Sequence, residues 1–93
     1  MHKTEKLILI EGTFLHGEAK EILMNVFTTK INYHEMKNFS SQERFGKEDA
    51  TAKKRIPALK KETDRLLKIL AEAKANNKQL IINSEIVISL SND

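Results

Sequence analysis

Residues 52–73 read AKKRIPALKKETDRLLKILAEA, and this stretch decides the fold. Small and apolar side chains recur in it at alternating intervals of four and three residues: Ala52, Ile56, Leu59, Thr63, Leu66, Leu70 and Ala73. Such spacing lines them along one side of an α-helix, as the seam of a helix pair. Leu67 and Ile69 widen the seam, which indicates cover from more than one side. We therefore expect a long helix that ends at Asn76-Asn77 and packs against another helix.

The start of this helix is less regular than its body. Pro57 lacks an N–H and crowds the preceding turn, so we expect the helix either to kink there or to become regular near it. Asp49 and Thr51 are the two candidate N-caps, since both side chains can accept a backbone hydrogen bond.

The partner helix is expected upstream, beginning between Thr13 and Gly17, with Thr13 as its candidate N-cap. One apolar stripe opens it: Ala19, Ile22, Leu23, Val26 and Phe27. Residues 28–37 can be read as helix or, over 30–36, as a short strand. Helix is favoured because Ile31 and His34 continue the stripe.

A second start signal follows this helix. Residues 40–43 read SSQE, which matches a capping box, so we expect a new helical turn to begin at Ser40. Gly46 is expected to close that turn in the left-handed conformation.

Two apolar segments at the ends of the chain are predicted to be strands. The first is Lys6 to Glu11, ended by Gly12, with Leu7 and Leu9 on one face and Ile8 and Ile10 on the other. The second is Gln79 to Leu90, in which alternate residues share a face: Leu80, Ile82, Ile86, Ile88 and Leu90. A turn or bulge at residues 83–84 is the alternative to one long strand, which is favoured because the alternation continues through it.

The element order predicts an α+β fold of βααβ type, a single domain over residues 1–93. A long antiparallel helical hairpin packs on a small antiparallel sheet. Two strands alone are marginal in water. The last strand is also expected to be longer than the first, which leaves part of it unpaired. We therefore expect homodimerisation to complete the sheet. The expected dimer interface consists of Leu80, Ile82, Ile86, Ile88 and Leu90.

Composition excludes several classes of protein. The 93 residues carry a net charge of +3 and include no Cys, which excludes a disulfide scaffold, a thiolate zinc site and a Cys nucleophile. No apolar run is long enough to span a membrane, so we expect a cytoplasmic protein without a membrane partner.

Catalytic and metal-binding signals are weak. His2, His16 and His34 are scattered without metal-ligand spacing, so we expect neither a metal nor a cofactor. Glu11 and Glu85 would form a carboxylate pair if the two strands adjoin, but exposure of both to solvent is favoured. With no nucleotide-binding or hydrolase motif either, we expect a protein that is not an enzyme.

Residues 44–61 form a basic segment, with seven basic side chains, two acidic ones and a net charge of +5. Its candidate polyanion contacts are Arg44, Lys47, Lys53, Lys54 and Arg55, and the segment also contains Lys60 and Lys61. Nucleic-acid or polyanion binding is therefore an alternative function, although no Tyr or Trp is interleaved for base stacking. The nearby aromatic residues Tyr33, Phe39 and Phe45 are expected to pin this region to the core, with a partner-binding patch as the alternative.

The segments EGTF at 11–14 and NFSSQERFGK at 38–47 resemble those of short bacterial proteins of unknown function. The resemblance implies a small bacterial protein and carries over no site residue. From the residues themselves, we expect a self-associating, non-enzymatic module for protein interaction or regulation.

Overall fold

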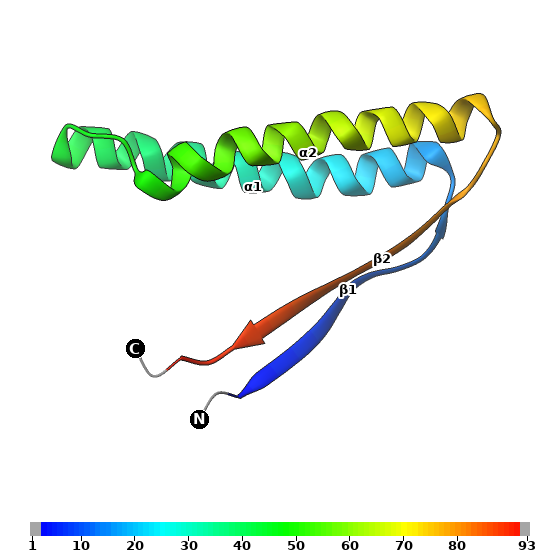
Figure 1. Cartoon of the computed structure of the whole chain (residues 1–93), viewed down its shortest axis with the longest axis horizontal. Coiled ribbons are helices and arrows are strands. Elements are labelled where there is room, and N and C mark those ends of the chain that lie inside the picture. The colour runs from blue at the N-terminus through cyan, green and yellow to red at the C-terminus, as the bar shows by residue number, and fades with distance from the viewer. Residues whose placement is uncertain (1–2, 92–93) are drawn as a thin grey trace.

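The computed structural model describes residues 3–91 and confirms the βααβ order. The elements are β1 (Thr4–Phe14), α1 (His16–Phe45), α2 (Ala50–Ala75) and β2 (Leu80–Ser89). The helices lie antiparallel as a hairpin, and the strands pair antiparallel into a two-stranded ribbon (Figure 1). The two strands join the helices at the paired residues Phe14 and Leu80, an end that is called the root of the ribbon below. Beyond the root, the ribbon diverges from the helical hairpin (Figure 1).

The seam predicted for α2 faces α1. Five of its members are buried: Ala52, Leu59, Leu66, Leu70 and Ala73. The helix begins ahead of Pro57, which lies inside it, and ends with Asn76 as the C-cap, as predicted. Asp49 is the N-cap, because its carboxylate accepts a hydrogen bond from the N–H of Ala52 at 2.9 Å.

α1 is one continuous helix, so residues 28–37 are helical as favoured. The prediction that a new helical turn begins at Ser40 is wrong, because α1 continues through this residue without a break. The hydroxyl of Ser41 instead donates to the carbonyl of Lys47 at 2.9 Å, and the side-chain oxygen of Asn38 accepts from the N–H of Asp49 at 2.8 Å. These bonds tie the end of α1 to the connection. Gly46 closes α1 in the left-handed conformation, with φ 67°, as predicted.

β1 is longer than predicted. It extends beyond both expected ends, Gly12 lies within it rather than ending it, and Thr13 pairs with Ile81 instead of capping α1. α1 begins after Leu15, whose N–H donates to the carboxylate of Glu18 at 3.0 Å. The acidic side chain of the first turn thus satisfies one backbone donor that lies outside the helix.

A β-bulge at Leu9 shifts the strand register. Ile8 lies opposite Glu85 and Ile10 lies opposite Ser84. Because Ser84 and Glu85 are successive residues of one strand, they point to opposite faces, and so do the isoleucines paired with them. The prediction that Ile8 and Ile10 share a face is therefore wrong.

The register gives the ribbon two unlike faces. The apolar face carries Leu7, Ile10, Phe14, Leu80, Ile82, Ile86 and Ile88, with Glu5 and Ser84 among them. The mixed face carries Ile8, Glu11, Ile81, Asn83, Glu85 and Val87. The apolar face is the one that meets the helices, since Phe14, Leu80 and Ile82 pack against the buried core.

That core is small and lies at the root of the ribbon. Ala19, Leu66 and Leu70 form its buried centre. Among residues 3–91, no large side chain is completely buried. The molecule measures 50 × 36 × 15 Å, and its radius of gyration is 16.7 Å, against about 12 Å for a compact chain of this length. The fold is therefore a flat, extended layer.

Candidate functional site

The residues predicted for the dimer interface divide into two groups. Leu80 and Ile82, at the root of the ribbon, are half-buried against the helical core of their own chain. Ile86, Ile88 and Leu90 lie further out and are exposed. The outer half of the ribbon thus presents apolar side chains that its own helices do not reach.

The structure contradicts one reason for expecting a dimer, namely that the last strand is longer than the first. The last strand does not outrun the first: β1 and β2 pair over their whole length, and the N–H of Leu90 still donates to the carbonyl of Lys3 at 2.9 Å. What lacks cover is the outer edge of each strand, because the sheet has only two members, and the apolar face beyond the root.

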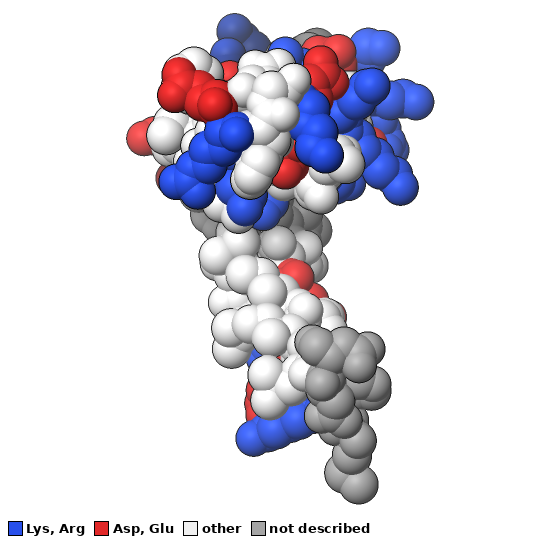
Figure 2. Space-filling view, turned by 90° about the vertical axis from the view of Figure 1, so that its left-hand side faces the viewer, with Lys and Arg blue, Asp and Glu red and all other residues white. Residues whose placement is uncertain are grey.

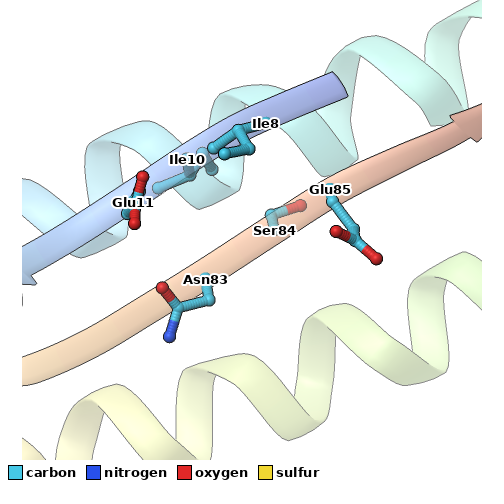
Figure 3. A pocket seen from close by; sticks show the side chains of 6 residues that line it. All are labelled: Ile8, Ile10, Glu11, Asn83, Ser84 and Glu85. Carbon is cyan, nitrogen blue, oxygen red and sulfur yellow. The ribbon is translucent and has the colours of Figure 1, made fainter. Parts of the chain in front are cut away.

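Glu11 and Glu85 lie on the mixed face of the ribbon, at a shallow hollow whose lining also includes Ile8, Ile10, Asn83 and Ser84 (Figure 3). Glu11 is paired with Asn83, so Glu85 is its diagonal neighbour two residues further along β2. In Figure 3 the two carboxylates sit at opposite ends of the hollow. Both are exposed, and neither makes a hydrogen bond or ion pair with the described part of the chain. The arrangement is that of two solvated carboxylates.

The basic segment forms the far end of the helical hairpin and part of α2. Its seven basic side chains are all exposed: Arg44, Lys47, Lys53, Lys54, Arg55, Lys60 and Lys61. Lys53 alone among them forms a salt bridge in the part described, to Glu48 at 3.9 Å. Figure 2 looks onto this end of the hairpin and shows charged side chains crowding the helices, whereas the ribbon below is mostly uncharged.

Lysines continue along α2 beyond the predicted segment. Lys54, Lys61 and Lys68 recur every seven residues, which aligns them on one side of a helix, and all three are exposed. The prediction stopped at Lys61 because it followed charge density along the sequence. The seven-residue spacing is the signal that includes Lys68.

The three predicted core aromatics are in fact exposed. Tyr33, Phe39 and Phe45 all point largely into solvent, so the expectation that they pin this region to the core is wrong. α1 and α2 meet along smaller side chains and His34, which leaves the rings outside. The alternative of a partner-binding patch remains a prediction.

His34 is buried on α1, with 5% of its surface exposed. Its ring lies edge-on to that of Tyr33, with centroids 5.3 Å apart, and Nε2 has no hydrogen-bond partner among the residues that the structure describes. His16 is exposed on the first turn of α1, and His2 lies outside the described residues. Over residues 3–91, no three side chains of metal-ligating type come together.

α1 carries a second apolar stripe that the sequence prediction missed. The opening stripe had been treated as one surface, but the structure separates it: Ala19, Leu23 and Phe27 contribute to the core, while Val26 is exposed. A distinct set recurs at intervals of four and three residues: Ile22, Val26, Thr29, Tyr33 and Met36. That spacing was the available signal.

No family model, no curated protein and no solved structure matches this chain. Between Lys3 and Ser91, no helix is both long and apolar enough to cross a membrane. What the chain does must therefore be inferred from its own surfaces.

Proposed function

We propose that the protein is a self-associating interaction module whose ribbon pairs with the ribbon of a second copy. The observation that carries this proposal is the surface area of the isolated chain. It exposes 7665 Å², whereas a compact monomer of 10.7 kDa exposes about 5,500 Å². The excess is about 2,100 Å². Obligate dimers bury about 1,000–2,500 Å² per copy, so a second copy accounts for an excess of this size.

Antiparallel pairing of β2 with the partner's β2 about a two-fold axis would satisfy both outer edges of these strands. The sheet would then have four strands. In this arrangement, the outer half of one ribbon lies beside the root of the other, where the other copy's helices cover the apolar face. Ile86 and Ile88 would thereby gain the cover that their own helices do not give them.

The test compares two substitutions on the same strand. Ile88→Lys places a charge on the apolar face, and Ile81→Lys places one on the mixed face, where Ile81 is already 78% exposed. Size-exclusion chromatography with light scattering is expected to give a dimer or larger for the wild type and Ile81→Lys, and a smaller species for Ile88→Lys. Circular dichroism checks that the helices persist. A wild type that is monomeric, or equal effects of both substitutions, would contradict the proposal.

A second candidate, polyanion binding, is supported by the exposed basic residues at the hairpin end, where Lys53 alone has an ion-pair partner among those described. Such a surface would contact phosphates without reading sequence. Fluorescence anisotropy with a short DNA duplex at low salt tests it. Charge reversal of Lys53, Lys54 and Arg55 should abolish binding, and reversal of Lys20 on α1 should not. No binding by the wild type would exclude this candidate.

A further inference from the structure

The second apolar stripe of α1 defines a surface apart from the ribbon. It consists of Ile22, Val26, Thr29, Tyr33 and Met36 and is called the α1 stripe below. At 1.5 Å per residue, it runs for about 21 Å along the helix. Successive residues of an α-helix turn by about 100°, so the middle of the α1 stripe lies about a third of a turn from the side that carries Leu23, Phe27 and His34 toward α2 and the core.

Nothing within the described chain covers most of this stripe. Val26 is 41% exposed, Tyr33 is 52% exposed and Met36 is 71% exposed. A shallow apolar hollow lies along it, lined by Asn25, Val26, Thr29, Lys30 and Tyr33. The ammonium of Lys30 sits 4.9 Å from the centre of the Tyr33 ring, which holds the ring at one rim of the hollow. The surface therefore presents exposed apolar side chains beside a shallow depression, and ridges and grooves of this kind are what packed helices interdigitate.

The spacing of the α1 stripe is self-complementary. If two such helices cross antiparallel with Thr29 at the centre, Ile22 faces Met36 of the other copy. Val26 then faces the other copy's Tyr33 within one residue of ideal register. Large side chains thus oppose large ones, while the small Thr29 lies at the axis where the two backbones are nearest. A two-fold contact requires this property, because the same patch must fit itself.

The area of the chain indicates that a second copy is the occupant. The excess of about 2,100 Å² over a compact monomer is more than twice the roughly 800 Å² that each partner buries in a standard-size interface, so it leaves room for a contact besides the ribbon.

We propose that the α1 stripe pairs antiparallel with the α1 stripe of a second copy, about a two-fold axis that passes near Thr29. The inference rests on the self-association proposed above, but it uses a different surface. Two different two-fold contacts on one chain join more than two copies, either as a closed tetramer or as an open chain. The wild type should therefore be larger than a dimer, and loss of either contact should reduce it.

Cross-linking tests this contact directly, because the natural sequence contains no Cys. Thr29→Cys places a thiol next to the proposed axis, and Thr28→Cys is the matched control, one residue away on the same exposed helix but off the stripe. A short bis-maleimide is expected to convert Thr29→Cys to a covalent dimer and to leave Thr28→Cys near background. The same pair of variants is then repeated with Ile88→Lys present, which removes the ribbon contact only.

The outcomes separate the two proposals. Preferential cross-linking of Thr29→Cys in both backgrounds supports the α1 contact, and it does so even if the ribbon contact fails. If the wild type self-associates but the two Cys variants cross-link equally or not at all, the α1 contact alone is overturned. A monomeric wild type, together with a Thr29→Cys variant that does not cross-link, overturns both. As a second readout, Tyr33→Glu should lower the mass of the assembly, and Thr28→Glu should not.

Discussion

The core at the root of the ribbon is so small that truncating a single side chain in it should lower the stability of the whole chain. Leu70 is 5% exposed and belongs to the cluster where α1, α2 and the ribbon meet. Truncating such a leucine to alanine costs about 3–5 kcal/mol, from lost burial and the cavity left behind. A chain of 93 residues has a total stability of only about 5–14 kcal/mol. Leu70→Ala is thus expected to lower the melting temperature by roughly 12–25 °C.

The matched control is Leu67→Ala, on the same helix, where the leucine is 40% exposed. Its cost should be under about 1.5 kcal/mol, since much of the side chain already contacts water. Urea unfolding followed by circular dichroism measures both, at one protein concentration because association adds to apparent stability. Equal costs for the two substitutions would refute the assignment of the core to the root of the ribbon.

Four further substitutions test three local features by thermal or urea unfolding. Gly46→Ala should destabilise the chain by about 1–2 kcal/mol, because Gly46 is left-handed with φ 67°. Gly17→Ala, in the open first turn of α1, should be neutral or stabilising. A similar loss of unfolding free energy for both would show that the left-handed backbone at Gly46 is not what sets the cost. Asp49→Ala should cost about 1 kcal/mol through loss of the N-cap bond to Ala52, and an unchanged urea midpoint would show that the cap is dispensable. His34→Leu should stabilise by about 1 kcal/mol, because it removes a buried Nε2 that has no partner, so a loss of stability would reveal a bond that His34 makes in the assembly.

The long-range features that were predicted correctly follow from periodicity. The alternating intervals of four and three residues identified the buried side of α2, where Leu59, Leu66 and Leu70 all lie. Alternation identified β2 as one strand, which Leu80 begins. Both patterns repeat over many residues, and their signal therefore exceeds the effect of any one residue such as Pro57.

The features that were missed depend on tertiary contacts. The capping box at Ser40 is a sound local signal, yet Asn38 and Ser41 bond to the connection after α1 and the helix continues through. The bulge at Leu9 exists only because of how β1 pairs with β2, so no pattern within β1 alone could reveal it. The aromatic rings of Tyr33, Phe39 and Phe45 were expected to pin a weakly helical stretch to the core, but they are exposed, whereas Ala52 and His34 are buried.

The candidate surfaces were predicted unevenly for a related reason. The basic segment was identified because charged residues can be counted directly along the sequence, and its basic side chains are exposed, as such residues usually are. The α1 stripe was missed because two apolar stripes share one helix, so residues such as Ile22 and Leu23 merged into a single broad pattern. Only the burial of one set and the exposure of the other separates them.

Sedimentation equilibrium of the wild-type chain, from sub-micromolar to high micromolar concentration, tests most directly whether one copy leaves too much apolar surface uncovered. If the chain self-associates as proposed, its mass is at least twice 10.7 kDa over most of that range, and the assembly dissociates only on dilution. A mass of 10.7 kDa at every concentration would contradict it.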